Sequence, residues 1–158
     1  VDAYIEDAGV DTLAHRRALL LPNLDRVGIG HYADANAIWT FDETSRTPPP
    51  FVAYPPPGPS PSVAVMGEWS FAAEEDVADA IITATDTATG RPYAVEQRAL
   101  PPAYGQDAIA FSLTPRPLAG EAVTIRVEGT HVSTSYDVTV VSCAAWLRST
   151  AAGPASRR

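Results

Sequence analysis

Apolar residues recur at helical spacing near the start of this chain and at every second position in its later part. Val1, Tyr4 and Ile5 lie at positions i, i+3 and i+4, the stripe of an amphipathic helix, and Gly9 ends that helix. The change from a helical period to a period of two predicts that the chain has two parts of different architecture.

A second helix is predicted between Asp11, whose side chain can accept hydrogen bonds from free N–H groups at a helix N-terminus, and Pro22, which cannot continue a helix. Residues 27–30 have the branched, glycine-interrupted character of a strand. Residues 30–36 are rich in Gly, Asp and Asn and predict a loop, and residues 37–41 predict a second strand. The first part is therefore expected to contain two helices and two strands.

A proline-rich segment follows, with eight prolines and no charged residue between positions 48 and 61. This composition favours extended polyproline II and leaves few backbone donors for a sheet. Phe51, Val52 and Tyr54 are nevertheless apolar, and a fully solvated linker rarely carries three such residues. We therefore expect residues 48–62 to be a linker that lies against a neighbouring module as a strap.

From residue 63 to residue 143 apolar side chains alternate with polar ones, and turns containing glycine or proline separate the runs. The alternating positions are Ala80/Ile82/Ala84, Tyr93/Val95, Ile109/Phe111/Leu113, Val123/Ile125/Val127 and Tyr136/Val138/Val140. With Trp69 and Phe71 on an opening strand, about six or seven antiparallel strands are predicted, as in an immunoglobulin-like β-sandwich. Residues 144–158 are rich in Ala, Ser, Gly and Arg and are predicted to be a disordered tail.

The order of motifs in the first part resembles a known family. Residues 14–17, Ala-His-Arg-Arg, are followed by a short polar turn and by Val-Gly-Ile-Gly at residues 27–30. The same order of a Gly-His-Arg helix, a turn and a Val-Gly-x-Gly strand is found in bacterial members of the CAP or SCP family, which includes cysteine-rich secretory proteins, allergen 5 and pathogenesis-related 1 proteins. Residues 37–41, the proline-rich segment and the Glu-Trp-Ser-Phe of residues 68–71 are similar to the pieces that follow in some secreted bacterial members.

This resemblance covers about residues 1–142 and implies an α+β fold. Residues 1–47 would be the C-terminal part of a CAP-type αβα sandwich, joined by the proline-rich strap to an immunoglobulin-like all-β sandwich of residues 63–143. The remaining CAP strands and helices would lie upstream of Val1. In the absence of that upstream part, five apolar residues are expected to face water or to dock poorly, namely Val1, Tyr4, Leu13, Leu20 and Ile38.

Composition and charge narrow the classes of function. Hydrophobic residues make up 46% of the chain, which is enough for a packed core. The net charge is −8 and all eleven basic residues are arginine, which argues against nucleic acid as a partner. No run of eighteen apolar residues occurs, so no transmembrane segment is predicted. Cys143 is the single cysteine, which excludes an internal disulfide and leaves the compartment undecided.

The CAP resemblance also implies a cleft with two histidines and two acidic residues. It places one histidine at His15 and one acid at Glu6 or Asp7, with their partners upstream of Val1. A metal such as Zn²⁺ needs four ligands, so His15 alone would be part of an incomplete site, and a Zn²⁺ cofactor is considered only for the full-length protein. The residues themselves leave a second interpretation open, in which His15 is a partly buried histidine that a carboxylate orients.

Other candidate residues carry less functional information. Arg16 and Arg17 are expected to be solvated helix positions, and His31 a loop residue. The chain has no Gly-x-Ser-x-Gly, Cys-x-x-Cys, His-Glu-x-x-His or phosphate-binding glycine loop. An enzyme of any kind would have to depend on His15.

The sequence therefore predicts a secreted, non-enzymatic CAP/SCP-family protein, found outside the cell or at its surface. Its expected partner is an extracellular ligand, which the resemblance leaves open as a lipid, a polysaccharide or a protein. One alternative is a hydrolase or metal-dependent enzyme that uses the histidine and acid of the CAP cleft. The other is a structural surface or adhesion module in which the β-sandwich is the working part.

Overall fold

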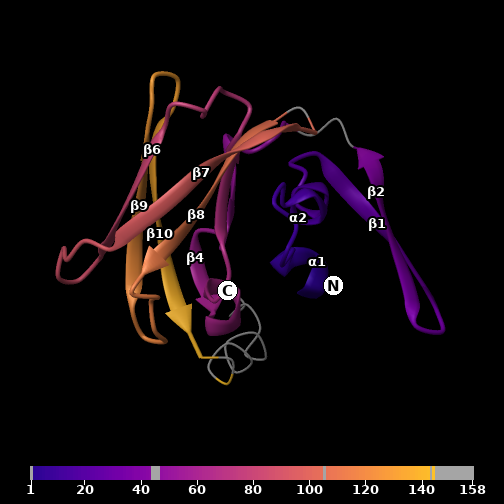
Figure 1. Cartoon of the computed structure of the whole chain (residues 1–158), viewed down its shortest axis with the longest axis horizontal. Helices are drawn as coiled ribbons and strands as arrows, with labels where there is room; N and C mark the ends of the chain where they lie inside the picture. The colour runs from indigo at the N-terminus through magenta and orange to yellow at the C-terminus, as the bar shows by residue number, and fades with distance from the viewer. Residues whose placement is uncertain (1, 44–46, 105, 143, 145–158) are drawn as a thin grey trace, which may run out of the picture.

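Strands dominate the chain, and two four-stranded sheets face each other in the computed structural model, which describes residues 2–43, 47–104, 106–142 and 144 (Figure 1). The elements are α1 (Asp2–Glu6), α2 (Ala14–Leu19), β1 (Leu24–Tyr32), β2 (Ala35–Glu43), β3 (Phe51–Tyr54), β4 (Gly58–Pro61), the 3₁₀ turn η1 (Ser62–Val65), β5 (Trp69–Ala73), β6 (Ile81–Asp86), β7 (Ala94–Ala103), β8 (Gln106–Thr114), β9 (Ala122–Glu128) and β10 (Ser133–Val141). Within this part of the chain, no helix is long and apolar enough to cross a membrane.

The two facing sheets form a β-sandwich. One sheet has the strand order β3-β5-β8-β7 and is antiparallel throughout. The other has the order β4-β10-β9-β6, in which β4 runs parallel to β10 and the other neighbours are antiparallel. Both sheets send alternate side chains inward, as period-two strands do.

The core of the sandwich lies between these sheets and confirms the alternation read from the sequence. Phe71, Ile109 and Phe111 come from one sheet, Ile125 and Val138 come from the other, and all five are almost completely buried. The predicted positions that are buried in this core are Ala80, Ile82, Ala84, Tyr93, Ile109, Phe111, Leu113, Val123, Ile125, Val127, Tyr136, Val138 and Val140. A β-sandwich was therefore predictable from the hydrophobic pattern alone.

The proline-rich segment lies against the sandwich, as expected, and it adds one strand to each sheet. Strand β3 pairs with β5, and β4 pairs with β10. Both occupy the edge of their sheet, which is where proline is tolerated because an edge strand needs only half of its backbone donors. The Phe51 ring packs on the core, with its centroid 5.2 Å from Phe71 and 5.5 Å from Tyr136.

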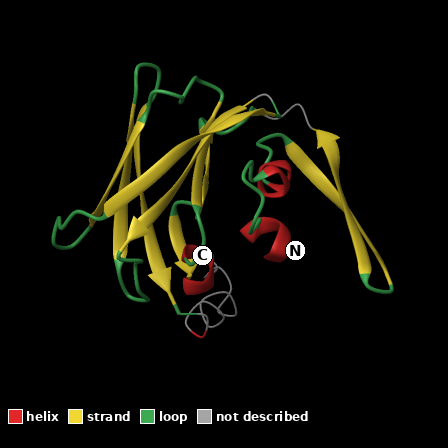
Figure 2. Cartoon of the chain, in the orientation of Figure 1, coloured by secondary structure: helices red, strands yellow, loops and turns green. Residues whose placement is uncertain are grey.

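The predicted α+β fold with a CAP-type αβα sandwich is wrong, because the chain is mostly β and its helices are short (Figure 2). Strands β1 and β2 pair only with each other among the described residues and form a separate two-stranded sheet. The loop predicted over residues 30–36 is also wrong, because β1 extends to Tyr32 and a two-residue turn leads into β2. Glycine and asparagine there lie within paired strands rather than in an open loop.

Helices α1 and α2 lie between the sandwich and the β1–β2 hairpin (Figure 1). Leu13, just before α2, is 1% exposed and packs on the outer face of the sheet β3-β5-β8-β7. That face offers Ala72, Ala108 and Ala110, whose small side chains let a helix approach closely. The expectation that Leu13 would be left uncovered is therefore wrong, because the sandwich covers it. The predictions for Cys143 and for residues 145–158 fall outside the described residues.

Candidate functional site

Asp7 and His15, two of the three residues expected to line a cleft, are in direct contact. Asp7 follows α1 with a positive φ of 51°, and its buried carboxylate is turned toward α2. Its Oδ1 lies 2.7 Å from Nδ1 of His15, and its Oδ2 accepts hydrogen bonds from the N–H groups of His15 at 2.9 Å and Arg16 at 3.1 Å. Asp7 therefore caps the start of α2 from eight residues away, in place of the predicted cap Asp11.

The His15 ring faces the hairpin rather than the sandwich. Its side chain is about half exposed, at 54%. The Tyr4 ring meets it edge-on with the centroids 5.4 Å apart, and the Tyr4 hydroxyl donates a 2.6 Å hydrogen bond to Oδ1 of Asn36 at the start of β2. This chain of contacts from Asp7 to Asn36 connects the helices to the hairpin.

Glu6, the third predicted residue, is directed elsewhere. Its exposed side chain lies at an open cavity of about 380 Å³, which the α1–α2 loop, the η1–β5 loop and β7 enclose. Arg98 crosses this cavity: its guanidinium donates to both carboxylate oxygens of Glu68 and to the carbonyl of Asp11. The hydrogen bond to Glu68 is the main cause that raises the pKa of Arg98. The structure thus brings Asp7 and His15 together and leaves Glu6 outside their contact.

The donor set around His15 does not fit a zinc ion. Both carboxylate oxygens of Asp7 already accept hydrogen bonds, and Nδ1 of His15 is engaged by one of them. Across the described ranges there is no group of three or more His, Cys, Asp or Glu side chains that could hold a metal. A zinc site needs four ligands, or three and a water, so the pair of Asp7 and His15 falls short of such a site.

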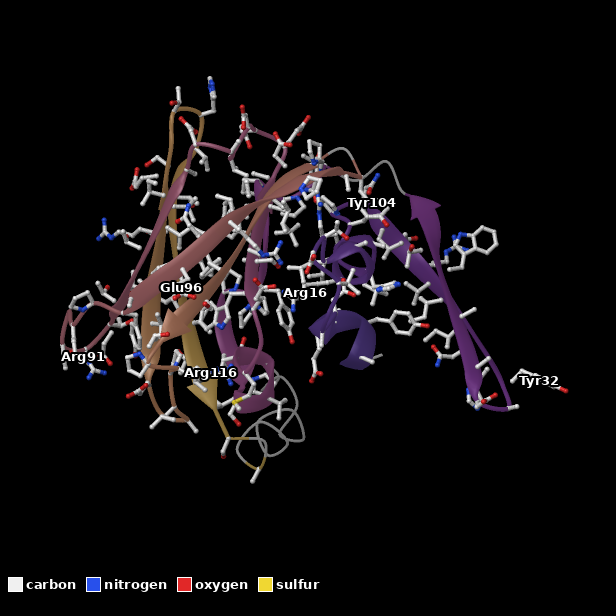
Figure 3. All side chains as sticks on the ribbon, viewed as in Figure 1. Arg16, Tyr32, Arg91, Glu96, Tyr104 and Arg116 are labelled. Atoms are coloured by element: carbon white, nitrogen blue, oxygen red, sulfur yellow. The ribbon has the colours of Figure 1, made fainter. Side chains whose placement is uncertain are left out.

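Arg16 is buried, which corrects the prediction that it is a solvated helix position (Figure 3). Its guanidinium donates to three backbone carbonyls, with Nε 2.5 Å from Ile5 O, Nη1 2.8 Å from Glu68 O and Nη2 3.0 Å from Glu6 O. It also lies 4.6 Å from the ring centroid of Tyr54 in β3. Burial lowers the pKa of Arg16, and the partners around it compensate for the lost hydration.

Arg17, the next residue of α2, is also buried, so the corresponding prediction is wrong as well. It donates to the carbonyls of Pro101 at 2.7 Å, Ala103 at 3.1 Å and Gln106 at 2.8 Å, all near the turn between β7 and β8. Burial lowers its pKa as well. Sequence reasoning missed this pair because backbone carbonyls are present at every residue and leave no trace in the sequence.

The β1–β2 hairpin carries four large apolar side chains that remain exposed: Val27 (47%), Ile29 (64%), Trp39 (63%) and Tyr32 (85%). Ile29 pairs with Ile38, and this pair shares the helix-side face with Asn36. Trp39 pairs with Gly28 and Tyr32 with Ala35 on the opposite, outer face. Tyr32 points away from the rest of the molecule at the hairpin tip (Figure 3). The hairpin therefore offers apolar surface on both faces.

Comparison with protein-family models, with curated proteins and with solved structures gives no match. The interpretation of the site therefore depends on its geometry.

Proposed function

We propose that this chain is a non-enzymatic binding protein. Its sandwich and docked helices position the β1–β2 hairpin at the surface, where the hairpin contacts another protein. One observation carries the proposal, namely the exposure of Val27, Ile29, Tyr32 and Trp39 on a hairpin whose main contacts are between its own two strands. An exposed apolar patch on an isolated element is typical of an interaction surface. Aromatic residues such as Trp and Tyr are also enriched among the residues that dominate binding energy.

The proposed location, outside the cell or at its surface, depends only on the order of motifs in residues 14–30, because the CAP-type sandwich is not formed. Of the ligand classes that the CAP resemblance leaves open, a protein is favoured over a lipid or a polysaccharide. The reason is that a two-stranded sheet presents unpaired backbone N–H and C=O groups at its edges, and another polypeptide satisfies both kinds of group.

A structural or adhesion role for the sandwich is the second candidate, and the strand order supports it. The orders β3-β5-β8-β7 and β4-β10-β9-β6 correspond to the A-B-E-D sheet and the G-F-C sheet of immunoglobulin-like domains, with β4 added beside β10. The enzyme alternative has support only from the contact between His15 and Asp7, and the capping of α2 already accounts for that contact.

A comparison of two matched variants tests the proposal. The hairpin variant carries Ile29→Ser and Trp39→Ser, and the sandwich variant carries Ile81→Ser and Val63→Ser, which replace residues of similar exposure. A partner is captured from a surface-protein extract, identified, purified and titrated against each form. We expect the hairpin variant to bind at least about tenfold more weakly, since each buried apolar side chain contributes roughly 1.5–3 kcal/mol, and the sandwich variant to bind normally.

Phosphatidylcholine vesicles and soluble polysaccharides are titrated in parallel. If only these ligands bind and the hairpin variant loses them, the partner is not a protein. If binding is lost in the sandwich variant and kept in the hairpin variant, the adhesion alternative replaces the proposal. Activity that disappears in His15→Ala would instead establish the enzyme alternative.

A further inference from the structure

Resting on the proposed function, we infer that the free edge of β1 binds an extended, positively charged peptide segment, which adds a third strand to the hairpin. The segment carries apolar residues on one face and basic residues in between. An isolated two-stranded hairpin is only marginally stable in water, and three strands with an apolar face are needed for independent stability. A bound segment would supply the third strand that the hairpin lacks.

The side chains of β1 are more exposed than the described side chains of β2. Eight of the nine residues of β1 are exposed, and only Leu24 is partly buried. In β2, by contrast, Thr40 is buried and Ile38 is partly buried. Since β1 pairs only with β2 in the part of the chain that the structure describes, its other edge is available to a new strand.

The hairpin turn determines which backbone groups point to that edge. Two residues separate β1 from β2, and Tyr32 pairs with Ala35 across this turn. The pair that closes such a turn is hydrogen-bonded, and bonded pairs alternate along an antiparallel ladder. The backbone groups of Gly28, Gly30 and Tyr32 are therefore directed to β2. Those of Ile29 and His31 are directed outward, toward an added strand.

The side chains of β1 leave room for a bulky partner on one face and offer apolar contact on the other. Ile29 lies on the helix-side face, because its partner Ile38 is two residues from Asn36, which contacts Tyr4 of α1. On the outer face, a Cβ built at Gly30 meets nothing within 4 Å. Apolar side chains of an added strand can pack beside Ile29 on the first face, while long side chains extend over Gly30 on the second.

The size of the hairpin favours a single segment over a second folded copy of this chain. Nine residues and two strands give a face of roughly 30 by 10 Å, or about 300 Å². A stable interface between folded proteins buries about 800 Å² per partner. The hairpin falls well short of that area, whereas strand addition obtains its affinity from backbone hydrogen bonds along an edge.

The charge of the chain determines which charge the bound segment should carry. The chain has a net charge of −8, so a second copy would be repelled and a basic segment attracted. Residues 24–43 hold four acidic residues and one arginine, so the hairpin is acidic on balance. Asp25 already pairs with that arginine, Arg26, at 3.6 Å, and Asp34 lies in the turn at the tip. A Lys or Arg at one end of an added strand would lie near Asp34.

Synthetic peptides of the same length as β1 test the inference, with binding followed by calorimetry and by fluorescence of the exposed Trp39. The probe alternates valine and lysine. One control alternates valine and glutamate, and the other is the probe with every backbone nitrogen methylated, which removes the hydrogen-bond donors of both edges. We expect the probe to bind one-to-one, and both controls to bind at least about tenfold more weakly, which corresponds to 1.4 kcal/mol.

Ile29→Pro removes one outward N–H group and should abolish binding of the probe, while the exposed Val63→Ser on the sandwich should leave it unchanged. The methylated peptide keeps the test valid if Ile29→Pro fails to fold. Equal binding of the methylated peptide overturns strand addition, and equal binding of the glutamate peptide overturns the charge preference. A dimer seen by light scattering and lost in Ile29→Pro would show that a second copy is the partner.

Strand addition to β1 and the proposed function of the hairpin can each be wrong independently of the other. If the probe does not bind, but the captured protein still depends on Ile29 and Trp39, the hairpin is the binding surface and strand addition is wrong. If neither the probe nor any captured protein depends on these residues, the proposed function itself is wrong.

Discussion

At the scale of single residues, two neighbouring arginines determine where the helices lie. Arg16 donates to carbonyls of α1 and of the η1–β5 loop, and Arg17 donates to carbonyls around the β7–β8 turn. A guanidinium presents five donors in a rigid fork, so each arginine can satisfy several carbonyls at once. The pair therefore fixes the helical segment to the sandwich without any charged partner being required at the carbonyls.

Replacing Arg17 should loosen the helices while leaving the sandwich folded. In Arg17→Ala three backbone carbonyls lose their donor, and each of these partly exposed hydrogen bonds contributes about 0.5–1.5 kcal/mol. We expect amide exchange in α2 to become at least about tenfold faster, with the melting of the sandwich little changed. Arg17→Lys should restore only part of the protection, because an ammonium group lacks the fork. Arg26→Ala on the exposed hairpin is the matched control, and an equal effect there would contradict this account.

At the scale of elements, a strand could be predicted from the sequence where its hydrophobic pattern was strong. Strands β6, β9 and β10 alternate between a buried and a solvated face, and they were predictable. Strand β8 is buried on both faces, but the apolar residues at every second position made it predictable too. Strands β3 and β4 were hidden by proline, which lowers the propensity for a strand but is tolerated at an edge. Helices α1 and α2 were predicted too long. They are five and six residues long, because only the helical turns that pack on the rest of the protein are stabilised.

The same distinction applies to the candidate site. The contact of His15 with a carboxylate agrees with the interpretation in which a carboxylate orients this histidine, and the family resemblance named Asp7 as one of two candidate acids. Its role as a helix cap was not, because Asp7 lies in a loop whose path depends on the tertiary fold. The exposed hairpin was also missed, since apolar residues in a predicted strand are ordinarily assigned to a core.

The packing of β3 gives a test of whether the proline-rich segment belongs to the sandwich. Phe51 stacks on Phe71 and lies against Tyr136, so Phe51→Ala removes a ring from the edge of the core. Because Phe51 is only partly buried, we expect a loss of about 1–3 kcal/mol, below the roughly 3–5 kcal/mol typical of a fully buried phenylalanine. Chemical denaturation measures it, with the exposed Val63→Ala as control. An unchanged denaturation midpoint would mean that the segment is a free linker.

At the scale of the whole molecule, three parts are held with decreasing strength. The sandwich has a continuous apolar core that draws on both sheets. The helices depend on that sandwich, through Leu13 and the two buried arginines. The hairpin depends on the helices in turn, through contacts such as the hydrogen bond from Tyr4 to Asn36. Each part is thus ordered by the one before it, and the proposed binding surface is the last.

Hydrogen exchange should therefore show three tiers along the chain. Amides of β5, β8, β9 and β10 should exchange only by global unfolding, because they lie in the core sheets. Amides of α2 should exchange when the helix separates from the sandwich. Their rate should be intermediate, and Arg17→Ala should increase it. Amides of β1 and β2 should exchange fastest, because a two-stranded hairpin opens locally. Addition of the valine–lysine peptide should slow exchange in β1 and β2 alone, since the added strand protects the hairpin without contacting the core. Exchange in the hairpin that is as slow as in β8 without any peptide would contradict this order, because it would mean that the hairpin is already stabilised and has no need of a partner strand.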